Sequence, residues 1–144
     1  MLFSLGQKPD DKVLKELLQN TKTIAVVGLS AKPQRDSHMV AAYMQKAGYR
    51  IIPVNPVESQ ILGQTCYPDL EAVPEPIDMV DVFRRSEFVP PIADDAIKIK
   101  AKALWLQLGV RHDQAAAKAA QAGLVVVQDL CLKVEHARLM GRPS

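Results

Sequence analysis

The sequence lacks the features that mark several large classes of protein. It has only two cysteines, Cys66 and Cys131, which form no CxxC pair and are too few for a secreted disulfide framework. No apolar run approaches the ~20 residues that span a bilayer. The N-terminal segment, residues 1–12, becomes charged too early for a signal peptide. We therefore expect a cytoplasmic protein with reduced thiols that does not cross a membrane.

An excess of one sign of charge is also missing. The chain has 18 Lys and Arg residues against 16 Asp and Glu residues, and its isoelectric point is about 8.6. A general nucleic-acid binder would exceed a value of ~9 and cluster its basic residues. The 144 residues, 48% of them apolar, fit one globular domain of ~100–150 residues. We therefore predict a single domain over residues 1–144 that has no nucleic-acid partner and binds at most a small anion.

Short apolar strands and amphipathic helices alternate along the chain. β-branched runs without polar alternation are typical of strands buried on both faces, and apolar residues at helical spacing separate them. The predicted strands are Thr23–Val27, Arg50–Val54, Met79–Phe83, Lys102–Leu106 and Leu124–Gln128. The predicted helices are Asp10–Asn20, His38–Ala47, Pro90–Lys100, Asp113–Ala122 and Leu130–Met140. The stretch Glu58–Asp78 is rich in Pro and Gly, so little more than a helical turn is expected there.

This alternation predicts an α/β fold. We expect one Rossmann-like domain of three layers, with a parallel five-stranded sheet, helices on both faces and a Rossmann-like or flavodoxin-like strand order. A leading helix would occupy residues 1–22, the sheet and crossover helices residues 23–128, and a closing helix with a tail residues 129–144.

Ligands of open parallel sheets bind outside the carboxyl ends of the strands. After the first strand come a glycine, two hydroxyls, two cations and the start of a helix, which together suit an anion. Alternatively, Ser37 only caps that helix and Lys32 and Arg35 are solvated charges. Arg84 and Arg85 follow another strand at the same edge, where two basic loops would otherwise repel each other, so they favour the anion site.

Two common nucleotide fingerprints are absent. Only the first glycine of GxGxxG is present, at Gly28, and the second strand ends in Val54-Asn55-Pro56 with no acid for the ribose of NAD. There is also no GxxxxGK[ST] motif, which disfavours a P-loop nucleotide hydrolase.

Five segments, taken in their order along the chain, resemble one protein family. The succession VGLSAKPQRDSHMV, IIPVNP with a following ILGQTCYPDL, VDVFRR, LWLQLGV and DLCLKVEHARL resembles the small stand-alone CoA-binding proteins of bacteria and archaea. That family is similar to the N-terminal CoA-binding domain of the succinyl-CoA synthetase alpha subunit. The resemblance covers roughly residues 23–140.

The resemblance implies that coenzyme A or a short acyl-CoA binds at the carboxyl edge of the sheet. The first loop would lie on the phosphates, Val54 to Pro56 beside the adenosine, Phe83 to Arg85 at the adenine or pyrophosphate, and Gln107 to Val110 towards the pantetheine. Coenzyme A has more negative charge than NAD and needs no carboxylate at its phosphorylated ribose. The candidate binding residues are Gly28, Leu29, Ser30, Lys32, Arg35, Ser37, His38, Val54, Asn55, Pro56, Phe83, Arg84, Arg85, Gln107, Gly109 and Val110.

Catalysis by this chain alone is not expected, but two alternatives stay open. Cys131 at a helix start suggests a thioester- or thiol-handling enzyme, although His136 at i+5 is turned about 140° away from it on a helix. The chain could instead present CoA to a ligase-like partner. The sequence also leaves open whether the chain binds another protein or a second copy of itself.

Three further residues suggest structural roles. His38 and His112 lie on separate loops, so no metal site is expected, because metals need at least three converging ligands. Each is expected to pack at a helix start. Asp81 lies inside an apolar strand, where we expect a backbone N–H or a nearby cation to pair with its carboxylate.

Overall fold

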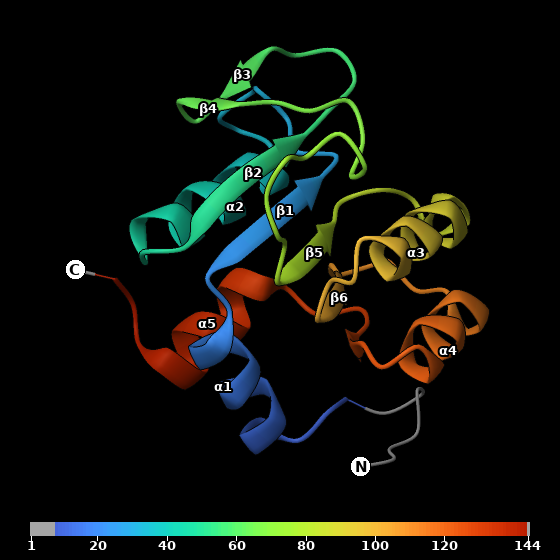
Figure 1. The fold of residues 1–144 in the computed structure, drawn as a ribbon. Coiled ribbons are helices and arrows are strands. Elements are labelled where there is room, and N and C mark those ends of the chain that lie inside the picture. Colours follow the sequence, from blue (N-terminus) through green and yellow to red (C-terminus); the bar gives the residue numbers. More distant parts are fainter. Residues whose placement is uncertain (1–7, 144) are drawn as a thin grey trace.

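The computed structural model describes residues 8–143, and their arrangement confirms the α/β prediction (Figure 1). All five strands of the central sheet are parallel, in the order β2-β1-β5-β6-β7. These strands are β1 (Thr23–Val27), β2 (Arg50–Val54), β5 (Met79–Val82), β6 (Ala103–Leu106) and β7 (Val125–Val127). The helices are α1 (Asp11–Asn20), α2 (Asp36–Lys46), α3 (Val89–Lys98), α4 (Asp113–Gln121) and α5 (Leu132–Met140). Residues 1–7 and 144, which belong to the predicted leading segment and tail, lie outside the described residues.

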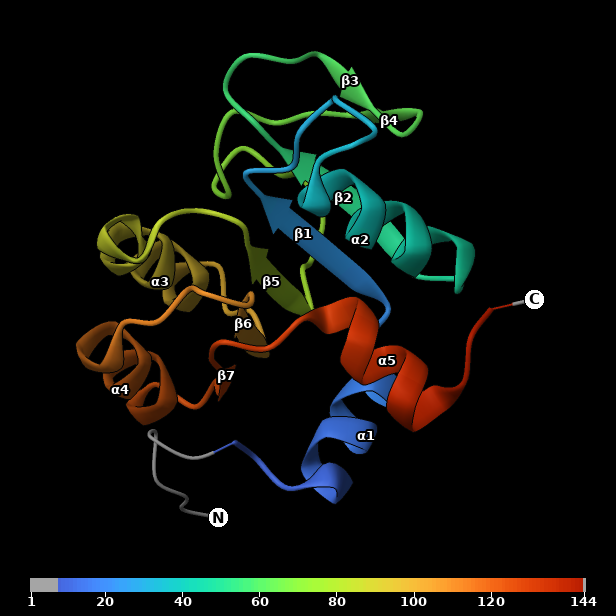
Figure 2. The same cartoon turned by 180° about the vertical axis from the view of Figure 1, so that it is seen from behind.

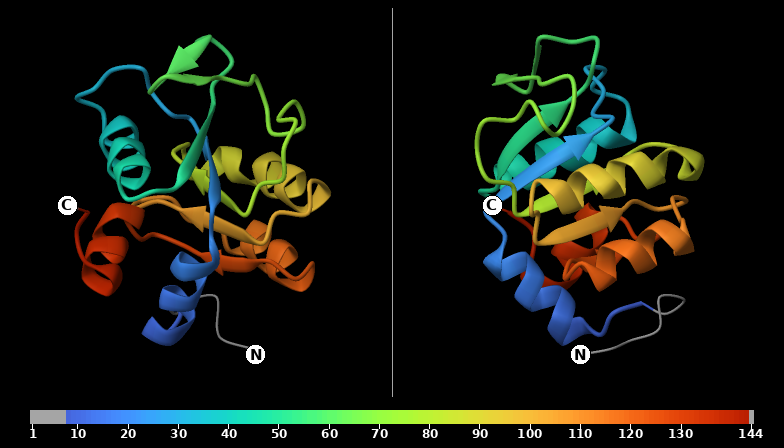
Figure 3. Two further views of the ribbon diagram at one scale, coloured as in Figure 1. Left: turned by 60° about the vertical axis from the view of Figure 1, so that its left-hand side comes forward. Right: turned by 45° about the vertical axis from the view of Figure 1, so that its right-hand side comes forward.

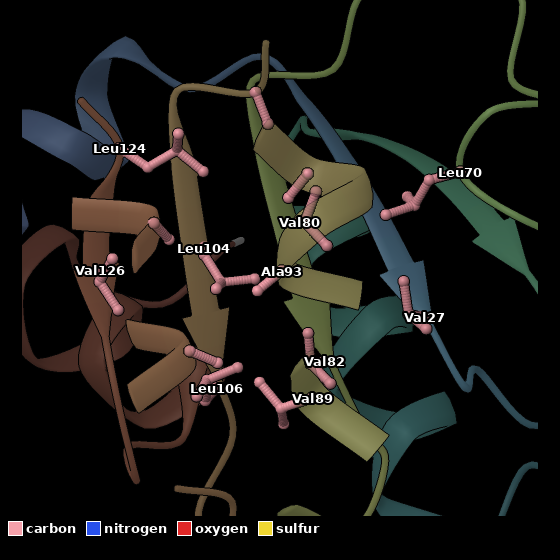
Figure 4. Close-up of a cluster of buried hydrophobic side chains, with 14 of the residues drawn as sticks. Val27, Leu70, Val80, Val82, Val89, Ala93, Leu104, Leu106, Leu124 and Val126 are labelled. Atoms are coloured by element: carbon pink, nitrogen blue, oxygen red, sulfur yellow. The ribbon is translucent and has the colours of Figure 1, made fainter. Parts of the chain in front are cut away.

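Helices cover both faces of the sheet and bury a separate apolar cluster on each. On one face α3 and α4 pack over β-branched and leucine side chains of the strands, among them Val80, Val82 and Leu104 (Figure 4). On the other face α1, α2 and α5 enclose a cluster around the fully buried Trp105 (Figure 2). Strands buried on both sides explain why their sequences show no polar alternation.

A one-residue bridge extends the sheet beyond β2. The N–H of Tyr67 donates to the carbonyl oxygen of Pro53 (3.1 Å), and the N–H of Asn55 donates to that of Tyr67 (3.0 Å), which makes a parallel bridge between Tyr67 and Val54. The five strands alone have the flavodoxin-like order 2-1-3-4-5. With Tyr67 counted as a minimal third strand, the order becomes 3-2-1-4-5-6, which is the Rossmann order. The two predicted orders therefore differ only by this bridge.

The segment before β5 contains a hairpin that the sequence analysis missed. Strands β3 (Gln60–Ile61) and β4 (Gln64–Thr65) pair antiparallel beyond the end of β2 (Figure 3). Leu62 and Gly63 between them both have positive φ, 54° and 73°, as a two-residue type I′ turn requires. The expectation of little more than a helical turn in Glu58–Asp78 was wrong, because Gly63 closes a hairpin there.

Several element boundaries also differ from the predictions. Helix α2 begins at Asp36 instead of His38, and α5 begins at Leu132 instead of Leu130. A 3-10 turn, η1 (Ser86–Phe88), precedes α3, which starts one residue before its two prolines. Pro at the first turn of a helix is tolerated because its missing N–H would have no partner there.

Ion pairs join the first and last helices. Both guanidinium NH groups of Arg138 in α5 donate to the carboxylate of Asp11 in α1 at 2.8 Å. Arg138 also bonds to the buried Glu135 (2.9 Å), which Lys8 contacts from the segment before α1 (2.9 Å). No helix within residues 8–143 is long and apolar enough to cross a membrane.

Candidate functional site

The loop after β1 turns against the end of β5, and only glycine fits there. Gly28 has φ +86°, and a Cβ atom on it would lie 2.4 Å from the carbonyl oxygen of Phe83. Its N–H donates to the carbonyl oxygen of Val54 at the end of β2 (3.0 Å). Gly28 therefore brings together the ends of three neighbouring strands, which allows a ligand to approach the backbone closely.

Ser37 holds the next part of this loop. The backbone N–H of Ser30 donates to the hydroxyl oxygen of Ser37 (2.9 Å), and the N–H of Lys32 donates to the hydroxyl oxygen of Ser30 (3.1 Å). Ser37 lies inside α2 and is not its N-cap. That position belongs to Arg35, whose side chain makes no capping bond. The alternative that Ser37 only caps the helix was therefore wrong, and no side chain within residues 8–143 caps the first-turn N–H groups of α2.

Two joined clefts lie along the carboxyl edge of the sheet. The loop cleft, of about 530 Å³, is lined by Gly28, Ser30, Lys32, Gln34, Arg35, Asp36, Ser37 and Phe83. The central cleft, of about 590 Å³, is lined by Asp36, Met39, Val40, Phe83, Arg84, Arg85, Gln107, Leu108, Gly109, Val110, Cys131, Lys133 and Val134. Phe83 and Asp36 line both, so the clefts adjoin each other at these residues. Each is within the ~300–1,000 Å³ of small-molecule sites.

Exposed cations border both clefts. Lys32 and Arg35 stand at the loop cleft, and Arg84 and Arg85 stand at the central cleft. The guanidinium carbons of the two arginines lie 4.8 Å and 5.2 Å from the ring centroid of Phe88, which supports them by cation–π contact. Asp36 is the carboxylate that lines both clefts, and its charge opposes an anion at this boundary. Even so, cations prevail along this edge.

Eleven of the sixteen predicted binding residues line these two clefts. The other five, which line neither cleft, are Leu29, His38, Val54, Asn55 and Pro56. Leu29 and Val54 are buried. The side-chain amide of Asn55 donates to the carbonyl oxygen of Leu29 (2.9 Å), and its Oδ1 accepts from the N–H of Val57 (2.8 Å), so Asn55 connects the loops after β1 and β2. Ligand contact stays a prediction for all sixteen residues, those that line the clefts included.

The structure adds apolar residues that the sequence analysis did not propose for the site. Met39, Leu108 and Val134 are 45%, 70% and 56% exposed, and all three line the central cleft. They come from α2, from the loop after β6 and from α5. The signal in the sequence was weak, because a single apolar residue in a loop or on a helix is common at protein surfaces.

Residues after β6 hold the start of α5 at the central cleft. The buried Gln107 accepts a hydrogen bond from the N–H of Leu132 at its Oε1 (3.1 Å). The N–H of Gly109 donates to Asp129 (2.6 Å). Gln107 therefore supports the start of α5, and Gly109 is bound to the loop after β7.

Cys131 lies at the start of α5, and its thiol has no base hydrogen-bonded to it among the described residues. It is the half-buried N-cap residue of α5 and lines the central cleft, and its thiol has no hydrogen-bond partner among the described residues. Nδ1 of His136 is instead 3.0 Å from the hydroxyl of Tyr43, and Glu135 is held by Lys8 and Arg138. This confirms that the helix forms no Cys131–His136 pair.

Asp81 contradicts the expectation of a partner for its carboxylate. It is fully buried in β5 between Val26 and Trp105, and neither carboxylate oxygen has a hydrogen-bond partner within residues 8–143. Burial raises its pKa well above the usual value. The predicted backbone or cationic partner was therefore wrong, because the neighbouring strands direct apolar side chains at this position.

The two other histidines pack at helix starts, as expected. His112 is the N-cap of α4 and accepts a hydrogen bond from the N–H of Ala115 (3.1 Å), while Nδ1 of His38 is 2.9 Å from the carbonyl oxygen of Ser30. Within residues 8–143 no group of three His, Cys, Asp or Glu side chains is placed to hold a metal ion.

Comparison with known proteins points to one family. The family model described as "CoA binding domain" matches residues 22–137. The protein YneT of Bacillus subtilis is 46% identical over 131 residues, which cover 91% of this chain and 97% of that protein. A solved structure of a protein from Pyrococcus horikoshii has a TM-score of 0.91 at 36% identity and covers 98% of this chain and 99% of its own. An ADP-forming acetate–CoA ligase I subunit alpha of Pyrococcus furiosus is 31% identical over 86 residues, which are 56% of this chain but only 19% of that subunit.

Proposed function

The chain belongs to the CoA-binding domain family, and from this premise we propose that it binds coenzyme A or a short acyl-CoA at the carboxyl edge of its sheet. The observation that carries this proposal is that the loop cleft and the central cleft adjoin each other along the edge of the sheet. The joined clefts offer two pairs of exposed cations and a helix start without a side-chain cap. Coenzyme A carries a pyrophosphate and a 3′-phosphate, which require such donors.

Each part of the ligand has a proposed place. The loop cleft, with Ser30, Lys32 and Ser37, would receive phosphate groups, and Val54 to Pro56 would lie beside the adenosine. Phe83, Arg84 and Arg85 would contact the adenine or the pyrophosphate. The uncharged pantetheine would run past Gln107, Gly109 and Val110 through the central cleft, where exposed apolar side chains match its lack of charge.

We propose that the chain acts as a binding module, without catalysis of its own. The thiol of Cys131 has no base among the described residues to activate it. The Pyrococcus furiosus ligase subunit extends far beyond the segment that matches this chain. A protein of this kind would hold CoA in the cytoplasm or present it to a ligase-like partner.

Calorimetry with CoA, NAD, NADP and ATP tests the proposal. CoA should bind most tightly, and Arg84→Ala should weaken it by about five- to tenfold, as expected for a lost charge-assisted contact of ~1–1.4 kcal/mol. Ser37→Ala should also weaken CoA, because the N–H of Ser30 loses its acceptor. Lys15→Ala, an exposed charge on α1, is the control. CoA binding no tighter than ATP, or unchanged CoA affinity in both site variants, would contradict the proposal.

The position of Cys131 in the central cleft favours a second candidate function, thiol handling. With oxidised CoA, the Cys131 thiolate would attack one sulfur of the CoA disulfide, form a mixed disulfide and release the other CoA as a thiol. Intact-mass spectrometry would detect an adduct that Cys131→Ser abolishes. If no adduct forms on the unaltered protein, this second candidate is rejected.

A further inference from the structure

A third cleft, which we call the basic cleft, is lined by residues of α2, of α5 and of the segment after α5. These two helices cover the same face of the sheet (Figure 2). The basic cleft has a volume of about 610 Å³. Its lining residues are Tyr43, Lys46, Lys133, Val134, Ala137, Arg138, Arg142 and Pro143. All of its charged residues are cations, and no carboxylate residue lines it within the described part of the chain.

Three of these cations have no carboxylate partner among the described residues. Arg138 is the exception, because its guanidinium forms ion pairs with the carboxylates of Asp11 and Glu135. Lys46, Lys133 and Arg142 form no ion pair within residues 8–143, and Lys133 instead places its ammonium 5.6 Å from the ring centroid of Tyr43. Like charges around one cleft repel each other, and an anion between them offsets this repulsion. The basic cleft is therefore suited to a negatively charged group.

The basic cleft adjoins the central cleft. Lys133 and Val134 line both. One side of α2 contributes lining residues to all three clefts in turn. Asp36 lines the loop cleft and the central cleft, Met39 and Val40 line the central cleft, and Tyr43 and Lys46 line the basic cleft. These residues lie at helical spacing and so form a stripe along the helix. Ten residues of α-helix rise by about 15 Å, so one elongated ligand can follow this stripe from the loop cleft to the basic cleft.

The chemistry of the lining changes twice along this path. Lys32, Arg35, Arg84 and Arg85 stand at the end proposed for the phosphates, and the exposed Met39, Leu108 and Val134 form the middle. Lys46, Lys133 and Arg142 stand at the far end. Such an order fits a ligand with phosphates at one end, an uncharged arm in the middle and a second anionic group beyond it.

We infer that the basic cleft receives a carboxylate at the acyl end of a CoA thioester, so that the preferred ligands are CoA thioesters of dicarboxylic acids. This inference rests on the proposed function. Coenzyme A itself has no negative group beyond its thiol, so the cations at the far end need an acyl group that carries one. An acyl carboxylate covalently joined to the arm reaches the basic cleft without a separate binding event.

The test compares two thioesters of equal chain length. Glutaryl-CoA and valeryl-CoA both have five acyl carbons, and only glutaryl-CoA ends in a carboxylate. By calorimetry at low salt, glutaryl-CoA should bind at least about fivefold more tightly, which corresponds to ~1 kcal/mol. Added salt should reduce this preference, because it screens the charges.

Variants assign the preference to this cleft. The double variant Lys46→Gln with Arg142→Gln should bind glutaryl-CoA and valeryl-CoA about equally, with unchanged affinity for CoA, because neither residue lines the loop or central cleft. Lys15→Gln on α1 is the matched control and should keep the preference. Both altered residues are exposed, so the fold should be retained, which circular dichroism checks.

The two proposals fail in different ways. Equal affinities of the unaltered protein for the two thioesters, or a preference that persists in the double variant, would overturn the inference alone. If neither thioester nor CoA binds, the proposed function is overturned, and the inference with it.

Discussion

Tyr43 and His136 join α2 to α5 through a contact of 3.0 Å between the tyrosine hydroxyl and Nδ1 of the imidazole. The rings of Tyr43 and Tyr49 both meet the imidazole edge to face, with centroids 5.4 Å and 5.6 Å away. The hydroxyl of Tyr49 donates to the carbonyl oxygen of Leu18 in α1 (2.7 Å). The buried histidine therefore lies where α1, α2 and α5 meet, and its protonation state bears on all three.

We predict that acid weakens the fold through His136. Burial lowers its pKa below the ordinary value of ~6.5, so the unfolded chain binds this proton more readily than the folded one. The contribution of His136 to stability should therefore be complete above pH ~6.5 and should fall as the pH drops towards the lowered folded pKa. An NMR titration of the imidazoles should show His136, assigned by loss of its signal in His136→Gln, titrating below pH 6.5. Titration at or above that value would contradict the prediction.

Asp81 should produce a pH dependence of the opposite sign. Its pKa is raised by burial, so the folded state retains a proton that the unfolded chain releases above its ordinary pKa of ~3.9. Stability should therefore fall as the pH rises from about 4 to the raised pKa. Asp81→Asn, which cannot ionise, should remove this slope, so the free energy of unfolding of the variant should change less between pH 4 and pH 8 than that of the unaltered protein. Urea unfolding of the unaltered protein and of the variant at several pH values measures the two free energies of unfolding. If both change with pH in the same way, the prediction is refuted.

Gly28→Ala should destabilise the protein and disturb the site together. The left-handed backbone conformation alone costs about 1–2 kcal/mol for alanine. The added methyl group would also collide with a backbone carbonyl, which cannot move away as a flexible side chain can. Gly48→Ala is the matched control, because Gly48 has φ +104° and nothing within 4 Å of a Cβ atom. Thermal unfolding should show a clearly larger loss for Gly28→Ala, whereas equal losses would mean that the close contact carries no cost.

Bound CoA should shield Cys131 from alkylation. Cys131 lines the central cleft, whereas Cys66, next to the β3–β4 hairpin, lines neither the loop cleft nor the central cleft. Saturating CoA should slow iodoacetamide labelling of Cys131 several-fold and leave Cys66 unchanged, as read by peptide mass spectrometry. Slowing of both thiols would instead indicate a general stabilisation, and slowing of neither would place the ligand elsewhere.

The sheet could be predicted because its strands are buried on both faces. Runs such as Thr23–Val27 are apolar without alternation, and the glycines and prolines between elements are distinctive. The β3–β4 hairpin escaped prediction because its two-residue strands are too short to show a period. The bridge at Tyr67 involves a single residue and has no pattern of its own.

The candidate site was predictable to the extent that it follows from topology. Residues after the strands of a parallel sheet meet at one edge, and this places Lys32 and Arg84 at joined clefts. Contacts that depend on packing between helices could not be read from spacing. Val134 reaches the central cleft only because α5 packs beside α2, and Asn55 is occupied with the backbone of Leu29.

The pairing of Asp11 with Arg138 has a consequence for the order in which the chain folds. The two residues are 127 positions apart, so nearly the whole described chain must be synthesised before their contact can close. During synthesis α1 leaves the ribosome before α5, so α1 lacks this ion-pair partner until α5 has emerged and folded. The ion pair is thus a late contact of a helix whose buried leucines and bond to Tyr49 can form earlier.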